Sequence, residues 1–127
     1  MPTAGSDTGR TAFAHDAVLT MAPGSDDRAP GGAITVALCG SWSHEPPCPL
    51  APHHTAASRS GEEVTLRVLF AAAAEDEDRV RRSIEDALRH GEGDDPDGVR
   101  SRWSVVRTGA SPVRAEELEH AGRLIRS

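Results

Sequence analysis

Most of the residues that could do chemistry lie in one segment, residues 39–54, which reads CGSWSHEPPCPLAPHH. It holds both cysteines of the chain and three of its six histidines, with the spacing C-x4-H-x3-C-x4-H-H. These candidate ligands are Cys39, His44, Cys48, His53 and His54. Two thiolates and two imidazoles form a tetrahedral donor set that suits Zn²⁺. The segment therefore predicts a metal site.

Zinc is the expected metal, and iron or copper would accept the same donors. Because neighbouring side chains point in different directions, we expect one of His53 and His54 to bind the metal. We take His53 as the ligand and His54 as the alternate, which otherwise hydrogen-bonds or faces solvent. The prolines of the segment restrict the chain and so lower the entropy that binding must overcome. However, the paired C-x2-C knuckles of zinc fingers and ribbons are missing.

Other interpretations of the same segment remain open. Buried cysteines often serve as small hydrophobic residues, and histidines are common in loops. A thiol-dependent enzyme would use Cys39 or Cys48, activated by an imidazole that Glu45 orients. A partner-binding accessory protein would use the proline-rich loop as its interaction surface. The sequence identifies no catalytic residue, and whether the protein is an enzyme stays open.

The composition excludes some classes of function. The chain of 127 residues has 14 basic residues, all arginine, against 20 acidic ones, and its net charge of −6 argues against nucleic-acid binding. We find neither a secretory signal nor an apolar run of membrane-spanning length. We therefore expect a cytoplasmic protein without membrane contact, in a compartment where thiols stay reduced.

The pattern of apolar residues predicts where the elements lie. Residues 1–32 lack a sustained apolar period and predict a disordered tail, with at most a transient helix over 13–21. Residues 33–39 and 63–71 alternate as strands, separated by a Cys/His/Pro-rich loop over 40–61. A helix is expected over 75–90, a third strand over 99–108, and a last helix after Ser111 and Pro112.

These elements predict a single α/β domain over residues 33–127. Its fold class is α+β, a small two-layer sandwich in the order β-β-α-β-α, with a three-stranded mixed sheet and two helices on one face. That arrangement leaves the other face of the sheet partly bare. We therefore expect a homodimer or a protein partner to cover it.

Overall fold

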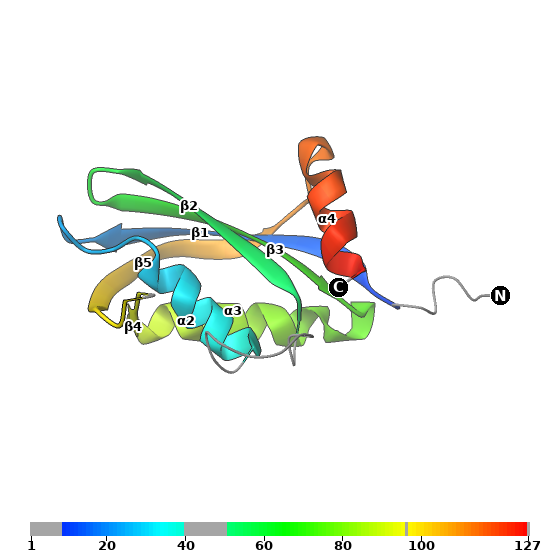
Figure 1. Ribbon diagram of the computed structural model, residues 1–127, viewed down its shortest axis with the longest axis horizontal. Coiled ribbons are helices and arrows are strands. Elements are labelled where there is room, and N and C mark those ends of the chain that lie inside the picture. Colours follow the sequence, from blue (N-terminus) through cyan, green and yellow to red (C-terminus); the bar gives the residue numbers. More distant parts are fainter. Residues whose placement is uncertain (1–8, 40–50, 96, 127) are drawn as a thin grey trace.

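The computed structural model describes residues 9–39, 51–95 and 97–126. Within them, five strands form one curled antiparallel sheet in the order β2-β3-β1-β5-β4 (Figure 1). The strands are β1 (Thr11–Met21), β2 (His53–Ser60), β3 (Glu63–Ala72), β4 (Glu92–Asp94) and β5 (Arg100–Ser111). The helices are α2 (Ala29–Cys39), α3 (Glu77–His90) and α4 (Leu118–Ile125), with short 3₁₀ turns η1 (Ala74–Asp76) and η2 (Ala115–Glu117).

The helices lie on both sides of the sheet. Figure 1 shows α2 and α3 together on one face and α4 on the other, near one end. Without β4 and α4, the chain order is β-α-β-β-α-β and the sheet order is β2-β3-β1-β5. This is the split βαβ, or ferredoxin-like, topology. Because many proteins share that topology, it carries no function by itself.

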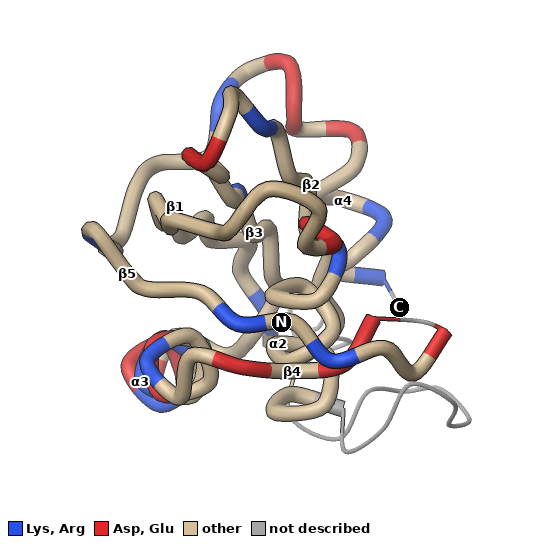
Figure 2. The backbone as a smooth tube through the Cα atoms, turned by 90° about the vertical axis from the view of Figure 1, so that its left-hand side faces the viewer, with Lys and Arg blue, Asp and Glu red and all other residues tan. Residues whose placement is uncertain are grey.

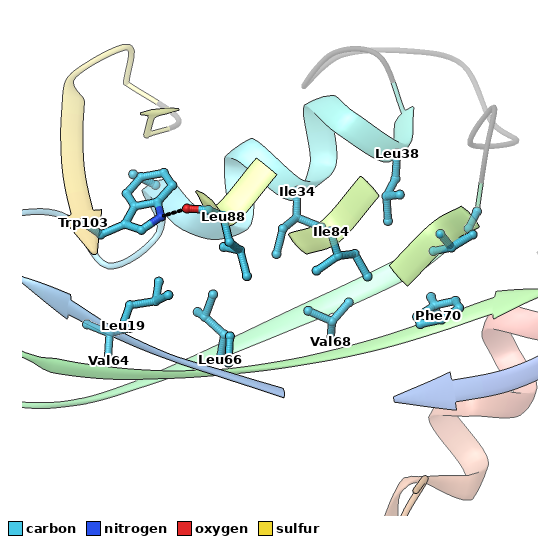
Figure 3. Packing of buried hydrophobic residues seen from close by; sticks show 14 of the residues in the cluster. Leu19, Ile34, Leu38, Val64, Leu66, Val68, Phe70, Ile84, Leu88 and Trp103 are labelled. Atoms are coloured by element: carbon cyan, nitrogen blue, oxygen red, sulfur yellow. Dashed lines mark hydrogen bonds between the residues drawn. The ribbon is translucent and has the colours of Figure 1, made fainter. Parts of the chain in front are cut away.

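The main core lies between the sheet and helices α2 and α3. Alternate residues of β3 point into it and meet Ile34 of α2 and Ile84 of α3 (Figure 3). These β3 residues are Val64, Leu66, Val68 and Phe70, all buried. The Trp103 indole N–H donates to the carbonyl of Leu88 at 2.8 Å, near the C-terminal end of α3. Figure 3 shows this bond closing one end of the core.

A smaller core lies on the opposite face of the sheet. Leu69 and Ala71 of β3 and Ala14 of β1 pack there against Leu124 of α4. This cluster covers part of the face that the sequence predicted to be bare. Leu69 is therefore buried within the chain and is not part of an exposed apolar surface.

The predicted fold class is wrong in three respects. The sheet has five antiparallel strands in the described residues, not three in mixed orientation. The two predicted helices, α3 and α4, lie on opposite faces. The predicted strand over 33–39 is the second half of helix α2. There Ile34 and Leu38 are buried whereas Val36 is 46% exposed, which is the helical period and not alternation.

The predicted tail and loop also contain strands that the sequence interpretation missed. Residues 1–32 include β1, which pairs with both β3 and β5 at the centre of the sheet, and the start of α2. Residues 40–61 include β2, an edge strand paired with β3. The predicted strand over 63–71 and helix over 75–90 correspond to β3 and α3. Figure 2 shows acidic and basic residues mixed along α3, as expected for a helix with one exposed face.

One arginine on β3 ties α4 to the sheet. All five guanidinium N–H groups of Arg67 are used: Nε and Nη2 bind the two carboxylate oxygens of Glu117, each at 2.7 Å. Nη1 donates to Asp16 and Ser111, and Nη2 also donates to the carbonyl of Pro112. The Arg67 side chain is only 12% exposed. Its hydrogen bonds therefore connect the sheet to the segment that leads into α4.

Replacing Glu117 by Gln should lower the free energy of unfolding at pH 7 by about 1–2 kcal/mol, because a charge-assisted pair becomes a neutral one at a partly hydrated site. Arg67 lowers the pKa of Glu117 to about 2. The stabilisation is thus fully present above the unfolded-state value and is lost as the pH falls from about 4.5 toward 2. Urea unfolding should show that the difference in unfolding free energy between the parent chain and Glu117→Gln becomes smaller across this pH range. An equal difference in unfolding free energy at pH 7 and pH 3 would contradict a stabilising ion pair between Glu117 and Arg67.

Candidate functional site

His53 lies where the chain enters the edge strand β2. Just before it, Ala51 is fully buried in the main core and the Pro52 carbonyl accepts a hydrogen bond from the Ala71 backbone N–H at 3.0 Å. In the antiparallel register His53 stands opposite Phe70, so its side chain lies on the face covered by α2 and α3. The backbone that carries the imidazole is therefore held by buried contacts.

Both ring nitrogens of His53 are engaged. Nδ1 lies 3.2 Å from the carbonyl oxygen of Ala51, and Nε2 lies 3.0 Å from Oγ1 of Thr35 on α2. Because a carbonyl only accepts, Nδ1 carries the proton. In the neutral ring, Nε2 then has a lone pair, which accepts a hydrogen bond from the Thr35 hydroxyl. The tautomer of His53 is thus set by the backbone.

Close packing brings α2 to β2 at this point. A Cβ added to Gly31 would lie 3.3 Å from Cγ2 of Thr55, so the absence of a side chain at position 31 lets the helix approach the edge strand. A hollow of about 470 Å³ remains between the two elements. Thr35, His53, Arg28 and Asp27 are among its lining residues.

The other predicted ligands are placed as follows. Cys39 is the last residue of α2, four positions and one helical turn after Thr35. His44 and Cys48 lie outside the described residues. His54 stands opposite Leu69 on the other face of β2, where its ring lies 4.5 Å from that of His120 on α4. His53 and His54 are therefore on opposite faces of the strand and do not come together.

The environment of His54 disfavours its charged form. Burial lowers the pKa of this imidazole, and the neighbouring His120 lowers it further. Across the described ranges, no group of three or more His, Cys, Asp or Glu side chains is arranged to hold a metal ion. A metal site at His53 would therefore need ligands from residues 39–50, whose side chains lie outside the described part of the structure.

A second polar cluster escaped sequence reasoning because it lies in the predicted tail. His15 of β1 is buried beneath α3. Its Nδ1 lies 3.0 Å from Nη1 of Arg81, and its Nε2 lies 2.9 Å from Oγ1 of Thr108 and 3.3 Å from Oε2 of Glu85. Arginine only donates, so Nδ1 accepts and Nε2–H donates. The apolar alternation of Phe13, Ala17 and Leu19 was the signal that could have placed His15 on an inward face.

Arg81 links this cluster to the core. Its guanidinium donates to the Ala14 carbonyl at 2.7 Å and to Glu77 at 2.8 Å, and it lies over the rings of Phe13 and Phe70. Every polar group of the cluster thus has a partner within the fold. We interpret it as a buried network that fixes α3 on the sheet.

Comparison with known proteins adds no relative to this picture. No family model, curated protein or solved structure matches the chain. No helix in the described ranges is long and apolar enough to cross a membrane. Cytoplasmic location and homodimerisation stay predictions.

The His15 network should make stability depend on pH near neutrality. Burial lowers the pKa of His15, and Arg81 lowers it further, against the opposing effects of Glu85 and Asp16. A base with a lowered folded-state pKa stabilises the fold above the unfolded value of about 6.5, and this stabilisation is lost as the pH falls through the folded value. His15→Gln, whose amide can accept from Arg81 and donate to Thr108, should flatten the decline in unfolding free energy between pH 7.5 and 5.

His54→Gln is a second, independent test in this measurement, because the pKa of His54 is also lowered and the residue lies on the opposite face of the sheet. Each substitution should reduce the slope of the unfolding free energy against pH, and the double variant should reduce this slope more than either single variant. A slope unchanged in His15→Gln would show that His15 titrates alike in the folded and unfolded states.

Proposed function

We propose that this protein binds a transition metal ion, zinc in the first place, with Nε2 of His53 as one ligand. The partners would be the thiolates of Cys39 and Cys48 and the imidazole of His44, as the spacing of the donors predicts. The observation that carries the proposal is the hydrogen bond from Nδ1–H of His53 to the carbonyl of Ala51.

This hydrogen bond matches what metal ligation requires of a histidine. Ligating imidazoles usually donate their second ring N–H to a carbonyl or carboxylate, which sets the tautomer and orients the ring. In His53 the arrangement leaves Nε2 as the nitrogen with the lone pair, on the side of α2. A tautomer with the proton on Nε2 would have made this nitrogen unable to coordinate.

The ends of the donor segment are anchored on the same core. Leu38, next to Cys39, and Ala51, two residues before His53, are both buried in the main hydrophobic cluster. His53 is in contact with Thr35, and Cys39 follows Thr35 by one turn of α2. The backbone of Cys39 and the side chain of His53 thus both lie by the second half of α2, which supports the proposal. Such anchoring lowers the cost of ordering the ligands between them.

Metal binding at Nε2 of His53 would break its hydrogen bond with the Thr35 hydroxyl. The hydroxyl donates to Nε2, and a metal ion would take the same lone pair. A hydroxyl can turn about its Cα–Cβ bond, so this displacement costs one neutral hydrogen bond. The Thr35→Val variant removes the competing donor while keeping the side-chain shape, and it should bind zinc at least as tightly as the parent chain.

The central test compares two adjacent histidines. The full chain, purified without an affinity tag under reducing conditions, should hold about one equivalent of zinc by elemental analysis. His53→Ala should weaken zinc binding by at least about 10-fold, because it removes a direct ligand. His54→Ala, whose side chain lies on the opposite face of β2, should leave the affinity unchanged.

Three outcomes would overturn the proposal. A metal-free protein whose melting temperature ignores added zinc would do so, as would equal zinc affinity in His53→Ala and the parent chain. Equal losses in the His53→Ala and His54→Ala variants would also contradict it. Loss of thiol reactivity and of an associated activity in Cys48→Ser, with metal content unchanged, would favour a thiol-dependent enzyme instead.

A further inference from the structure

The face of the sheet that carries α4 is built from rows of side chains that run across four strands. The antiparallel registers place these residues directly opposite one another. The first row, beneath α4, is His54, Leu69, Ala14 and Ser111. The second is Ala56, Arg67, Asp16 and Gly109. The third is Ser58, Thr65, Val18 and Arg107. Among the described helices, α4 alone lies over this face, near one end (Figure 1).

The second row is already neutralised. Arg67 uses all its N–H groups on Asp16, Glu117, Ser111 and Pro112, so it offers no donor to a ligand. The carboxylates of Asp16 and Glu117 are in turn held by Arg67. Within the row, the charges of Arg67 and Asp16 therefore cancel, and Glu117 adds one negative charge beside it.

The third row and the segment after β5 carry positive charge that is not cancelled in this way. Arg107 stands on the open face opposite Val18, and Arg114 lies just before η2. Among the described residues, neither guanidinium forms an ion pair with a carboxylate. The net charge of the whole chain is −6, so this local excess is opposite in sign to the overall charge.

These two arginines border a hollow of about 360 Å³, together with the hydroxyls of Ser58 and Thr65 and the small apolar side chains of Val18 and Ala56. Asp16 and Arg67, which form an ion pair with each other at 2.8 Å, also line it. A second hollow of about 210 Å³ adjoins it at Arg107 and Gly109. Nothing lies within 4 Å of where a Cβ of Gly109 would stand, so the missing side chain leaves space beside Arg107. The hollow thus combines Arg107 and Arg114, one Arg–Asp ion pair, two hydroxyl groups and small apolar side chains.

We propose that this hollow binds a small molecule carrying a dianionic phosphate group. A phosphate monoester carries a charge of about −1.5 to −2 at pH 7, which matches the two arginines. The guanidinium fork binds phosphate oxygens in a bidentate manner, and the two hydroxyls can donate to the remaining oxygens. The volume lies at the small end of the range of ligand pockets. This site lies on the opposite face of the sheet from His53 and does not depend on metal binding.

The test is a titration of the full ¹⁵N-labelled chain with inorganic phosphate, at constant ionic strength set with chloride. Saturable shifts should appear in the amides of residues 56–58, 65–67 and 105–108. Arg107→Gln should weaken the affinity at least about 10-fold, since one of two charge-assisted contacts is lost. Ala56→Leu, which fills the hollow and changes no charge, should also abolish saturable binding.

The matched control is Arg82→Gln on the exposed side of α3, which changes the net charge equally on the other side of the sheet. It should bind phosphate like the parent chain. Equal weakening in Arg82→Gln and Arg107→Gln would show a nonspecific charge effect and overturn the proposal. Shifts that do not saturate, or shifts located away from these residues, would also overturn it. Folding of each variant is verified by its amide spectrum without phosphate.

Discussion

The alternation of β3 is the constraint on which the rest of the structure depends. Its even-numbered residues from Val64 to Phe70 form the floor of the main core beneath α2 and α3. Its odd-numbered residues Arg67 and Leu69 hold α4 on the other face, through an ion pair and an apolar contact. A shift of one residue in the pairing of this strand would exchange the two sets and put Arg67 into the core. Three layers are therefore fixed by the register of a single strand.

The same alternation divides the donor segment. Because β2 pairs with β3 residue by residue, the face of Phe70 becomes the face of His53, and the face of Leu69 becomes that of His54. One histidine is turned toward α2 and the other toward His120. Two neighbouring imidazoles that look equivalent in the sequence thus receive different partners. The strand register therefore decides which of the two imidazoles faces α2.

Part of the fold was predictable from the sequence. The strand over 63–71 and the helix over 75–90 follow from clear apolar periods, and the chain folds them as β3 and α3. The strand predicted over 33–39 failed because Ile34 and Leu38 satisfy both periods in a run this short, and Gly31 and Gly32 argue against a helix. The packing of Thr55 against Gly31 is a tertiary contact, which no local sequence pattern predicts.

The central strand β1 was missed because it contains polar residues, including His15 and Asp16, whose partners come from α3 and β3. The candidate ligands could be found by residue type alone, but the hydrogen bond of His53 to Ala51 required the fold.

We propose that the fold holds Nε2 of His53 in a form that a metal ion can bind. The most direct measurement is a long-range ¹H–¹⁵N correlation spectrum of the histidine rings, recorded on the metal-free chain and again after one equivalent of zinc. Before zinc is added, the proton of the neutral His53 ring should lie on Nδ1. Zinc should then shift the Nε2 resonance of His53 and leave both nitrogens of His54 in place. A proton on Nε2 in the metal-free chain, or an Nε2 resonance of His53 that zinc does not move, would contradict it.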